Sequence, residues 1–294
     1  MTKNQEKIQE ALSRIDQGLA SIETDEDWIA FLRFQSRFYQ YSFGNTMLIF
    51  MQNSQASYVK GYRAWEAMGR HVRKGEKAIA ILAPCFRKVT EFKEPEDKTV
   101  YHDETGEREE KRVIGGFRIA YVFDLAQTEG DDSQLPVLVT GLAGNGQQEK
   151  ELYEQLKKYI STKLPVEEVE GTSSKGSYCI ETGVIKVRSD LDYVQRIKTL
   201  IHEFSHHIDF TLNPARDIPR NKRELVAESV AFIVSLRLGL DTASYSMSYL
   251  KTWLKDREEL KEIADTVQKV ASTIINELAG STDSAFSDLQ EEEE

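Results

Sequence analysis

Three of the five histidines lie within six residues, in the segment 199–210, TLIHEFSHHIDF. His202 and His206 are four residues apart, so on a helix both side chains project from one face and can bind the same ion. With Glu203 between them they form the pattern HExxH, a metallopeptidase signature. Chance would give about 0.01 such matches at this composition, which favours a metal site over two buried structural histidines. His207 points off the shared face, and we expect it at the surface or beside the site.

A catalytic zinc takes three protein ligands and keeps one position for water, so a third donor must come from another element. Glu224 and Glu228 are the best candidates because they lie four apart on one face of a predicted helix, 222–238, whose other face is apolar. We assign Glu224 as the ligand and Glu228 as the acceptor for the second ring nitrogen of a ligating histidine. The reverse assignment stays open, as does a solvent-facing role for both; Asp209 is a weaker alternative.

The donor set also indicates a reaction. Zinc held there would lower the pKa of a bound water to about 7 and polarise a scissile carbonyl. Glu203 would then act as the general base, taking the proton of the water and passing it to the leaving amine. Two imidazoles and a carboxylate suit Zn²⁺, and Mn²⁺, iron or cobalt can occupy the same ligands. The oxyanion donor is not identified; Tyr178 and Tyr193 are the candidates.

The second half of the chain must position these residues, and its pattern is mostly helical. Helices are predicted over 150–162, 193–210 and 222–238, with one or two more between 244 and 278. A short strand at 166–170 and a hairpin formed by 178–180 and 184–187 complete this half.

The first half mixes helices with a hairpin. Predicted helices cover 3–20, 25–40, 45–52 and 61–69, and predicted strands cover 78–83, 86–90 and 117–124. The charged segment Glu91 to Arg112 is expected to be an exposed loop, and 141–148 reads as a linker.

Aromatic and basic residues are concentrated in this first half. Eight aromatics fall in the 28 residues from Phe38 to Trp65, and eight basic residues against two acids fall between Tyr58 and Lys88. Cations that follow phosphates beside rings that stack on bases are typical of single-stranded nucleic-acid sites. The alternative, favoured by composition alone, is that the rings are core and the cations a solvated face.

Composition excludes several classes of protein. The 294 residues correspond to about two domains, and 40% apolar residues can form a core. A net charge of −11 argues against a protein that is basic all over. The two cysteines lack metal or disulfide spacing, and no segment resembles a membrane span or a secretory signal, so we expect a cytoplasmic protein with no membrane partner.

Several segments together resemble the ArdC-type antirestriction family. In the first half these are 41–45 (YSFGN), 61–65 (GYRAW), 68–77 (MGRHVRKGEK) and 79–84 (IAILAP). In the second half they are 202–206 (HEFSH) and 224–228 (ELVAE). The resemblance covers most of the chain, from about residue 25 to about residue 240.

This resemblance implies an α+β chain with a mixed α/β single-stranded-DNA-binding domain at 1–142, a zincin-like metallopeptidase domain at 148–280 and an acidic tail at 281–294. It implies a protein of conjugative mobile elements that helps incoming DNA escape restriction. The positions that it places near single-stranded DNA are Tyr41, Phe43, Asn45, Trp65, Arg70, Lys74 and Lys77. A restriction subunit or a repressor is then a possible protein substrate, and a DNA-binding protein with a structural or vestigial metal site is the main alternative.

Overall fold

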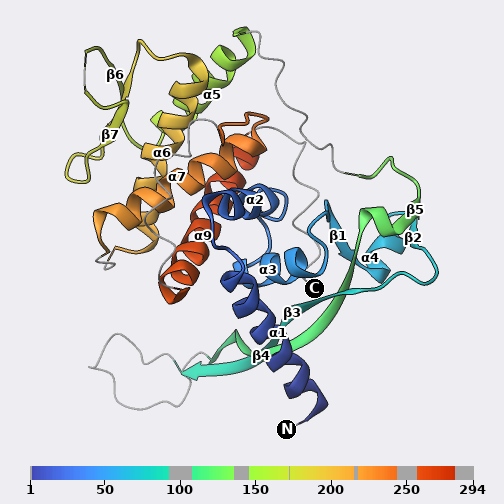
Figure 1. Ribbon diagram of the computed structural model, residues 1–294. Coiled ribbons are helices and arrows are strands. Elements are labelled where there is room, and N and C mark those ends of the chain that lie inside the picture. The colour runs from blue at the N-terminus through green and yellow to red at the C-terminus, as the bar shows by residue number, and fades with distance from the viewer. Residues whose placement is uncertain are drawn as a thin grey trace, which may run out of the picture.

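The computed structural model describes residues 2–92, 108–135, 146–171, 173–214, 218–243 and 257–281. Its architecture is mixed α+β, as predicted. Figure 1 shows a group of helices that contains α6, α7 and α9, and a long two-stranded hairpin, β3 and β4, with α1 beside it. None of the helices in these ranges combines the length and the apolar character needed to cross a membrane.

The first two N-terminal helices begin at the predicted residues, and the next two begin at Phe43 and Tyr62 instead of 45 and 61. Thr2 and Thr24 form capping boxes, and the Ser42 hydroxyl accepts from the Asn45 backbone N–H. The predicted helix 25–40 ends early, at Gln35, because the following residues turn and their carbonyls accept hydrogen bonds from the Gln268 side chain. The helices are α1 (Lys3–Ala20), α2 (Asp25–Gln35), α3 (Phe43–Gln52) and α4 (Tyr62–Ala67).

The hairpin consists of β3 (Ile79–Phe92) and β4 (Arg108–Asp124), and β1 (Val59–Gly61) pairs with the outer side of β4. The two strands predicted at 78–83 and 86–90 are one strand with a β-bulge between Cys85 and Phe86. The ends of the predicted loop 91–112 continue the ladder, and 93–107 lies outside the described residues. A small second sheet pairs β2 (Arg70–Val72) with β5 (Thr128–Gly130), after the short helix η1 (Leu125–Gln127).

The second half follows the predicted order. Its sheet has β8 (Ile185–Arg188) in the centre, parallel to β6 (Val166–Val169) and antiparallel to β7 (Gly176–Tyr178), which is therefore an edge strand. The helices are α5 (Gln147–Ser161), α6 (Tyr193–Leu212), α7 (Arg220–Arg237) and α9 (Arg257–Ser281). Most of the predicted linker and of the acidic tail lies outside the described residues.

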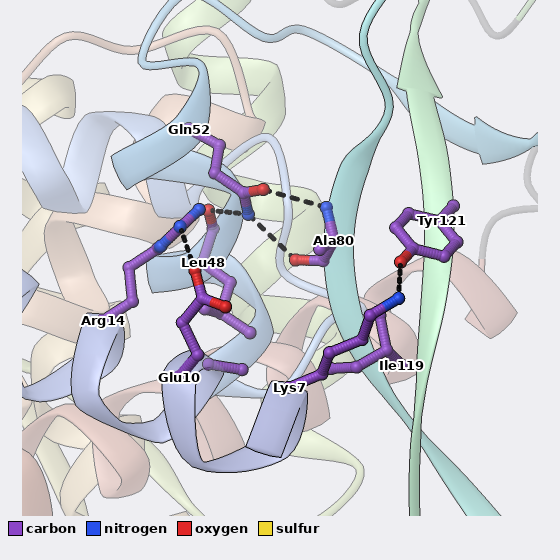
Figure 2. Close-up of a pocket in the computed structure, with 9 residues that line it drawn as sticks. Lys7, Glu10, Arg14, Leu48, Gln52, Ala80, Ile119 and Tyr121 are labelled. Carbon is purple, nitrogen blue, oxygen red and sulfur yellow. Dashed lines mark hydrogen bonds and ion pairs between the residues drawn. The ribbon is translucent and has the colours of Figure 1, made fainter. Parts of the chain in front are cut away.

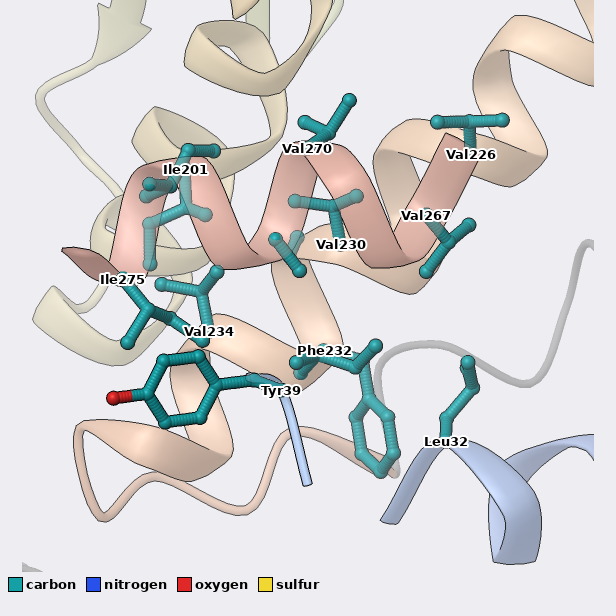
Figure 3. Close-up of a cluster of buried hydrophobic side chains, with 14 of the residues drawn as sticks. Leu32, Tyr39, Ile201, Val226, Val230, Phe232, Val234, Val267, Val270 and Ile275 are labelled. Atoms are coloured by element: carbon teal, nitrogen blue, oxygen red, sulfur yellow. The ribbon is translucent and has the colours of Figure 1, made fainter. Parts of the chain in front are cut away.

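One hydrophobic core joins the two halves of the chain. Figure 3 shows Leu32 and Tyr39 from the first half beside Phe232 and Val234 of α7. A smaller core beneath the hairpin contains Phe34, Phe38, Ile49, Val59, Ile79, Ile81 and Val122. The first-half helices therefore pack directly on the helices that carry the predicted metal ligands, while the domain boundaries at 142 and 148 stay a prediction.

Candidate metal centre

The candidate metal ligands are carried by α6 and α7. The Asp192 side chain caps α6 by accepting from the Gln195 backbone N–H, and the apolar face of α6 is buried through Leu200, Ile201 and Phe204. In α7 two small residues near the carboxylates, Ala227 and Ala231, are fully buried. Small side chains let the two backbones approach, which brings the α7 carboxylates to the α6 histidines.

His202, His206 and Glu224 come together as a possible metal-binding group. Each offers one ligand atom, and the three atoms lie within 4.8 Å of one another. Glu224 Oε2 lies 3.3 Å from His202 Nε2 and 3.7 Å from His206 Nε2. Two imidazole nitrogens and one carboxylate oxygen match the donor set of a three-ligand zinc site with an open position. Asp209 is not in this group.

Glu228 contacts the other side of the His202 ring. Its Oε2 lies 3.4 Å from Nδ1, while Nε2 of the same ring faces Glu224. A ligating histidine usually donates its second N–H to a carboxylate, which fixes the ring orientation and the tautomer. This geometry favours Glu224 as the ligand and Glu228 as the orienting partner.

The pKa values of the residues at the site follow from this arrangement. Burial lowers the pKa of His202, but hydrogen bonds with Glu224 and Glu228 outweigh burial and raise this pKa to about 9. Hydrogen bonds to His202 and His206 hold the pKa of Glu224 far below its usual value. Burial opposes ionisation of Glu228, yet His202 and Lys198 lower its pKa to about 2. Both carboxylates are therefore ionised, so Glu224 can bind a cation and Glu228 can accept from His202 and Lys198.

Glu203 lies beside the histidines and is buried, with 8% of its surface exposed. Burial is the largest cause that raises the pKa of its carboxyl group, and the backbone N–H of Tyr178 hydrogen-bonds to it. The edge strand β7 approaches closely here: a Cβ at Gly176 would lie 3.1 Å from Glu203 Oε1 and 2.5 Å from Thr199 Cγ2. Sequence reasoning missed Gly176, because its role depends on a contact between distant elements.

His207 takes the position expected off the ligand face. Its ring stacks on Phe204, and its Nδ1 lies 3.0 Å from the Tyr178 hydroxyl. Tyr193, the other candidate oxyanion donor, packs against Tyr153 and Arg196. The oxyanion donor therefore stays unassigned.

Five of the seven positions expected near DNA have partners inside the protein. Phe43 and Trp65 are fully buried, and the Trp65 indole N–H donates to the Phe123 carbonyl at 2.9 Å. The other three are held by hydrogen bonds: the Asn45 amide to the backbone of Leu82, the Tyr41 hydroxyl to the Val59 carbonyl, and the Arg70 guanidinium to Thr128 and Asp132.

The other two expected positions, Lys74 and Lys77, are exposed. Direct contact of any of the seven with DNA stays a prediction. The burial of Phe43 and Trp65 agrees with the alternative reading of the aromatic segment as core.

A different set of rings is exposed on the hairpin. Phe86, Phe117 and Tyr121 are 55%, 49% and 48% exposed. Phe117 lies opposite Pro84 and Tyr121 lies opposite Ala80, so these two rings share one face of the hairpin, and Phe86 follows Pro84 by two residues on β3, just past the bulge. At the base of this face, Figure 2 shows the Lys7 ammonium of α1 donating to the Tyr121 hydroxyl at 3.0 Å. Arg87, Lys88 and Arg118 are exposed on the same hairpin.

Comparison with known sequences finds a family match for the first half of the chain. Residues 3–123 match the family model of the N-terminal domain of anti-restriction factor ArdC. The chain is also 25% identical over 325 aligned positions to pXO2-81, an uncharacterized protein of Bacillus anthracis. That alignment covers 99% of this chain and 54% of the relative, so the chain spans about half the length of the curated relative it matches.

Comparison with solved structures extends the likeness over the second half. The Mn(II)-bound crystal structure of the antirestriction ArdC protein from the R388 plasmid has a TM-score of 0.53 and 18% identity, over 93% of this chain and 98% of that chain. The metal-free structure of the same protein has a TM-score of 0.49 and 19% identity, over 82% and 86% of the two chains. Residues 3–123 of the chain are therefore similar to the ArdC N-terminal domain, and the chain as a whole shares its fold with the Mn(II)-bound ArdC structure.

Proposed function

We propose that this chain is an antirestriction protein whose second half is a zincin-like, metal-dependent peptidase. The observation that carries the proposal is the convergence of His202, His206 and Glu224 from two helices, with Glu203 beside them. These three residues would hold one divalent ion, Zn²⁺ or Mn²⁺. When bound, the ion would supply an acidified water and a Lewis acid for a peptide carbonyl.

Other residues of the chain transfer the proton and hold the reacting groups in position. Glu203 accepts the proton of the attacking water at its carboxylate and returns it to the leaving amine. Its burial raises its pKa, which makes the protonated state easier to hold between these two transfers. The Tyr178 backbone N–H orients the carboxylate, and Glu228 fixes the His202 ring.

A non-catalytic protein with a structural metal is the second candidate. Such a site needs ligands that fill its coordination sphere and has no use for an additional buried carboxylate. Glu203 is buried next to the group without belonging to it, and burial of an unneeded carboxylate is unfavourable. This observation favours catalysis over a structural role.

Cleavage of a repressor instead of a restriction subunit would use the same residues.

The test compares the metal-loaded wild type with Glu203→Gln on denatured casein and on isolated restriction subunits. We expect cleavage by the wild type and a loss of at least about 100-fold in the variant, the scale of a general base. Both proteins must bind the same amount of metal, since Glu203 is not a ligand. Equal cleavage by the two proteins, or no cleavage of any substrate by either, would reject the peptidase.

We further propose that single-stranded DNA binds the exposed aromatic face of the hairpin, defined by Phe86, Phe117 and Tyr121. Stacking on exposed rings and attraction of phosphates to nearby cations are the two contributions that such binding needs. The hairpin has both: the rings are about half exposed, and Arg87, Lys88 and Arg118 are exposed beside them. DNA bound there would place the peptidase at the point where incoming single strands are held.

A further inference from the structure

A buried lysine lies one helical turn before the first histidine of the site. Lys198 and His202 are four residues apart on α6, so they share a face. The Lys198 ammonium forms an ion pair with Glu228 Oε1, and its side chain is 11% exposed. The other oxygen of the same carboxylate, Oε2, lies 3.4 Å from His202 Nδ1. Lys198, Glu228 and His202 thus form a continuous chain of polar contacts that ends at the ligand group.

We propose that Lys198 is a positioning residue of the metal centre, which acts through Glu228. Its ammonium holds one carboxylate oxygen so that the other accepts the Nδ1–H of His202, and His202 Nε2 is then directed at the ion. This inference rests on the proposed metal site. It adds a residue that is neither a ligand nor in contact with the reacting atoms.

The charges around His202 explain why this residue is needed. Three carboxylates, those of Glu203, Glu224 and Glu228, lie at the site. At the exposed edge, the Arg220 guanidinium lies 3.5 Å from Glu224 and is 88% exposed. On the buried side, Lys198 faces Glu228, whose side chain is 12% exposed.

Without Lys198, the strongest cation within reach of the Glu228 carboxylate would be the metal ion. Glu228 would then lose the ammonium that fixes its orientation, and the His202 ring would lose its acceptor. A buried carboxylate with no countercharge is also unfavourable in itself. Lys198 therefore keeps Glu228 in the orientation in which it accepts from His202.

The competing explanation is that the ion pair only connects α6 to α7. A structural connection would change the stability of the metal-free protein and leave metal affinity unchanged once the protein is folded. A positioning role predicts that the Lys198 change weakens metal binding when Glu228 is present and has no further effect once Glu228 has been replaced. A double-mutant cycle measured on metal affinity separates the two explanations.

The experiment measures Zn²⁺ affinity by competition with a chromophoric chelator. The proteins are the wild type, Lys198→Met, Glu228→Gln, the double variant and Lys198→Arg. We expect each single variant to bind Zn²⁺ about 10- to 100-fold more weakly, the scale for residues that orient metal ligands. The double variant should bind no more weakly than Glu228→Gln alone. Lys198→Arg should restore most of the affinity, because it keeps the cation.

Lys186→Met is the matched control, since the ammonium of this exposed lysine pairs with Glu167 at 3.6 Å and not with Glu228. Should Lys198→Met not fold, Lys198→Gln takes its place, and Lys198→Arg still reports on the cation. Wild-type Zn²⁺ affinity in a folded Lys198→Met protein would overturn the role of Lys198 but not the proposed metal site. The same holds if the affinity losses of the two single variants multiply in the double variant. A wild type that binds no Zn²⁺ would overturn the proposed metal site as well.

Discussion

The indole N–H of Trp28 donates a hydrogen bond to the hydroxyl of Ser229 at 3.2 Å, in the buried contact between α2 and α7. Ser229 follows Glu228 directly, so a helix of the ArdC-type N-terminal part is joined to the helix that carries the candidate metal carboxylates. Gln268 of α9 adds a second connection by donating to the Phe38, Tyr39 and Tyr41 carbonyls. The N-terminal region and the metal helices therefore support each other.

Replacement of Gln268 by Ala should destabilise the whole protein. It removes the donor to the buried Tyr39 carbonyl, at a cost of about 1–3 kcal/mol for an unsatisfied group. Because one core joins the two halves, we expect denaturant unfolding of the wild type and of the variant to remain a single transition, with a lower midpoint in the variant. Gln17→Ala on exposed α1 surface is the control and should leave the midpoint unchanged. Separate transitions for the two halves would contradict this account.

Gly176→Ala should disturb the edge strand next to Glu203. The added Cβ would lie 2.5 Å from Thr199 Cγ2 and 2.9 Å from the Lys186 carbonyl oxygen. Overpacking of this kind costs about 1–3 kcal/mol, so thermal unfolding should shift to a lower temperature. Ser177→Ala, on the exposed side of the same strand, is the matched control. An unchanged melting temperature in Gly176→Ala would show that β7 does not pack this closely on α6.

Much of the helical half could be predicted from the sequence, because caps and apolar spacing are local signals. The hairpin could not: the β-bulge that joins two predicted strands into one is set by the pairing of Cys85 with Gly116 and of Phe86 with Ile114. Contacts between distant segments also decide which aromatic residues are exposed, so the residues available to DNA could not be chosen from the sequence alone. Counting aromatics identified a dense segment, but only packing decides that Trp65 is buried and Phe117 exposed.

The hairpin surface gives a test of DNA binding. Phe86→Ala and Phe117→Ala should each weaken binding of a single-stranded oligonucleotide, since stacking contributes about 1–3 kcal/mol per base. Both rings are exposed, so neither change should affect folding. Fluorescence anisotropy at several salt concentrations is the measurement, with a slope of about −0.7 per neutralised phosphate.

Two controls locate the DNA surface. Phe210→Ala removes an exposed ring from α6, which carries no part of the proposed DNA surface, and should bind DNA like the wild type. The double variant Lys74→Ala, Lys77→Ala tests the two exposed positions expected from the family resemblance. Wild-type binding by both hairpin variants would move the DNA site away from the hairpin.

The metal-free protein should show a pH dependence that comes from His202. The folded-state pKa of His202 is about 9, above its ordinary value of 6.5. A group with a raised pKa adds stability that is fully present below the unfolded pKa and is lost as the pH rises through the folded pKa. The difference in unfolding free energy between wild type and His202→Gln should therefore shrink from about pH 6 to about pH 10. Chelator-treated samples in guanidinium give the measurement, and a constant difference would contradict the charged pair.

Part of the candidate metal site could be predicted from the sequence. The spacing of His202 and His206 is local to one helix, so it predicts a shared face without knowledge of the fold. The choice between Glu224 and Glu228 depends on how α7 packs on α6, and the structure favours Glu224 through its 3.3 Å and 3.7 Å distances to the two rings. Lys198 and Gly176 carry no motif and emerge only from contacts between elements.

Metal content is the most direct test of the central claim that His202, His206 and Glu224 hold a divalent ion. The purified wild type, loaded with Zn²⁺ or Mn²⁺ and freed of excess ion, should retain about one equivalent per chain by mass spectrometry. His206→Ala should retain less than about a tenth of that amount, because it removes one of three ligands. Equal metal in the two proteins, or none in the loaded wild type, would contradict the account.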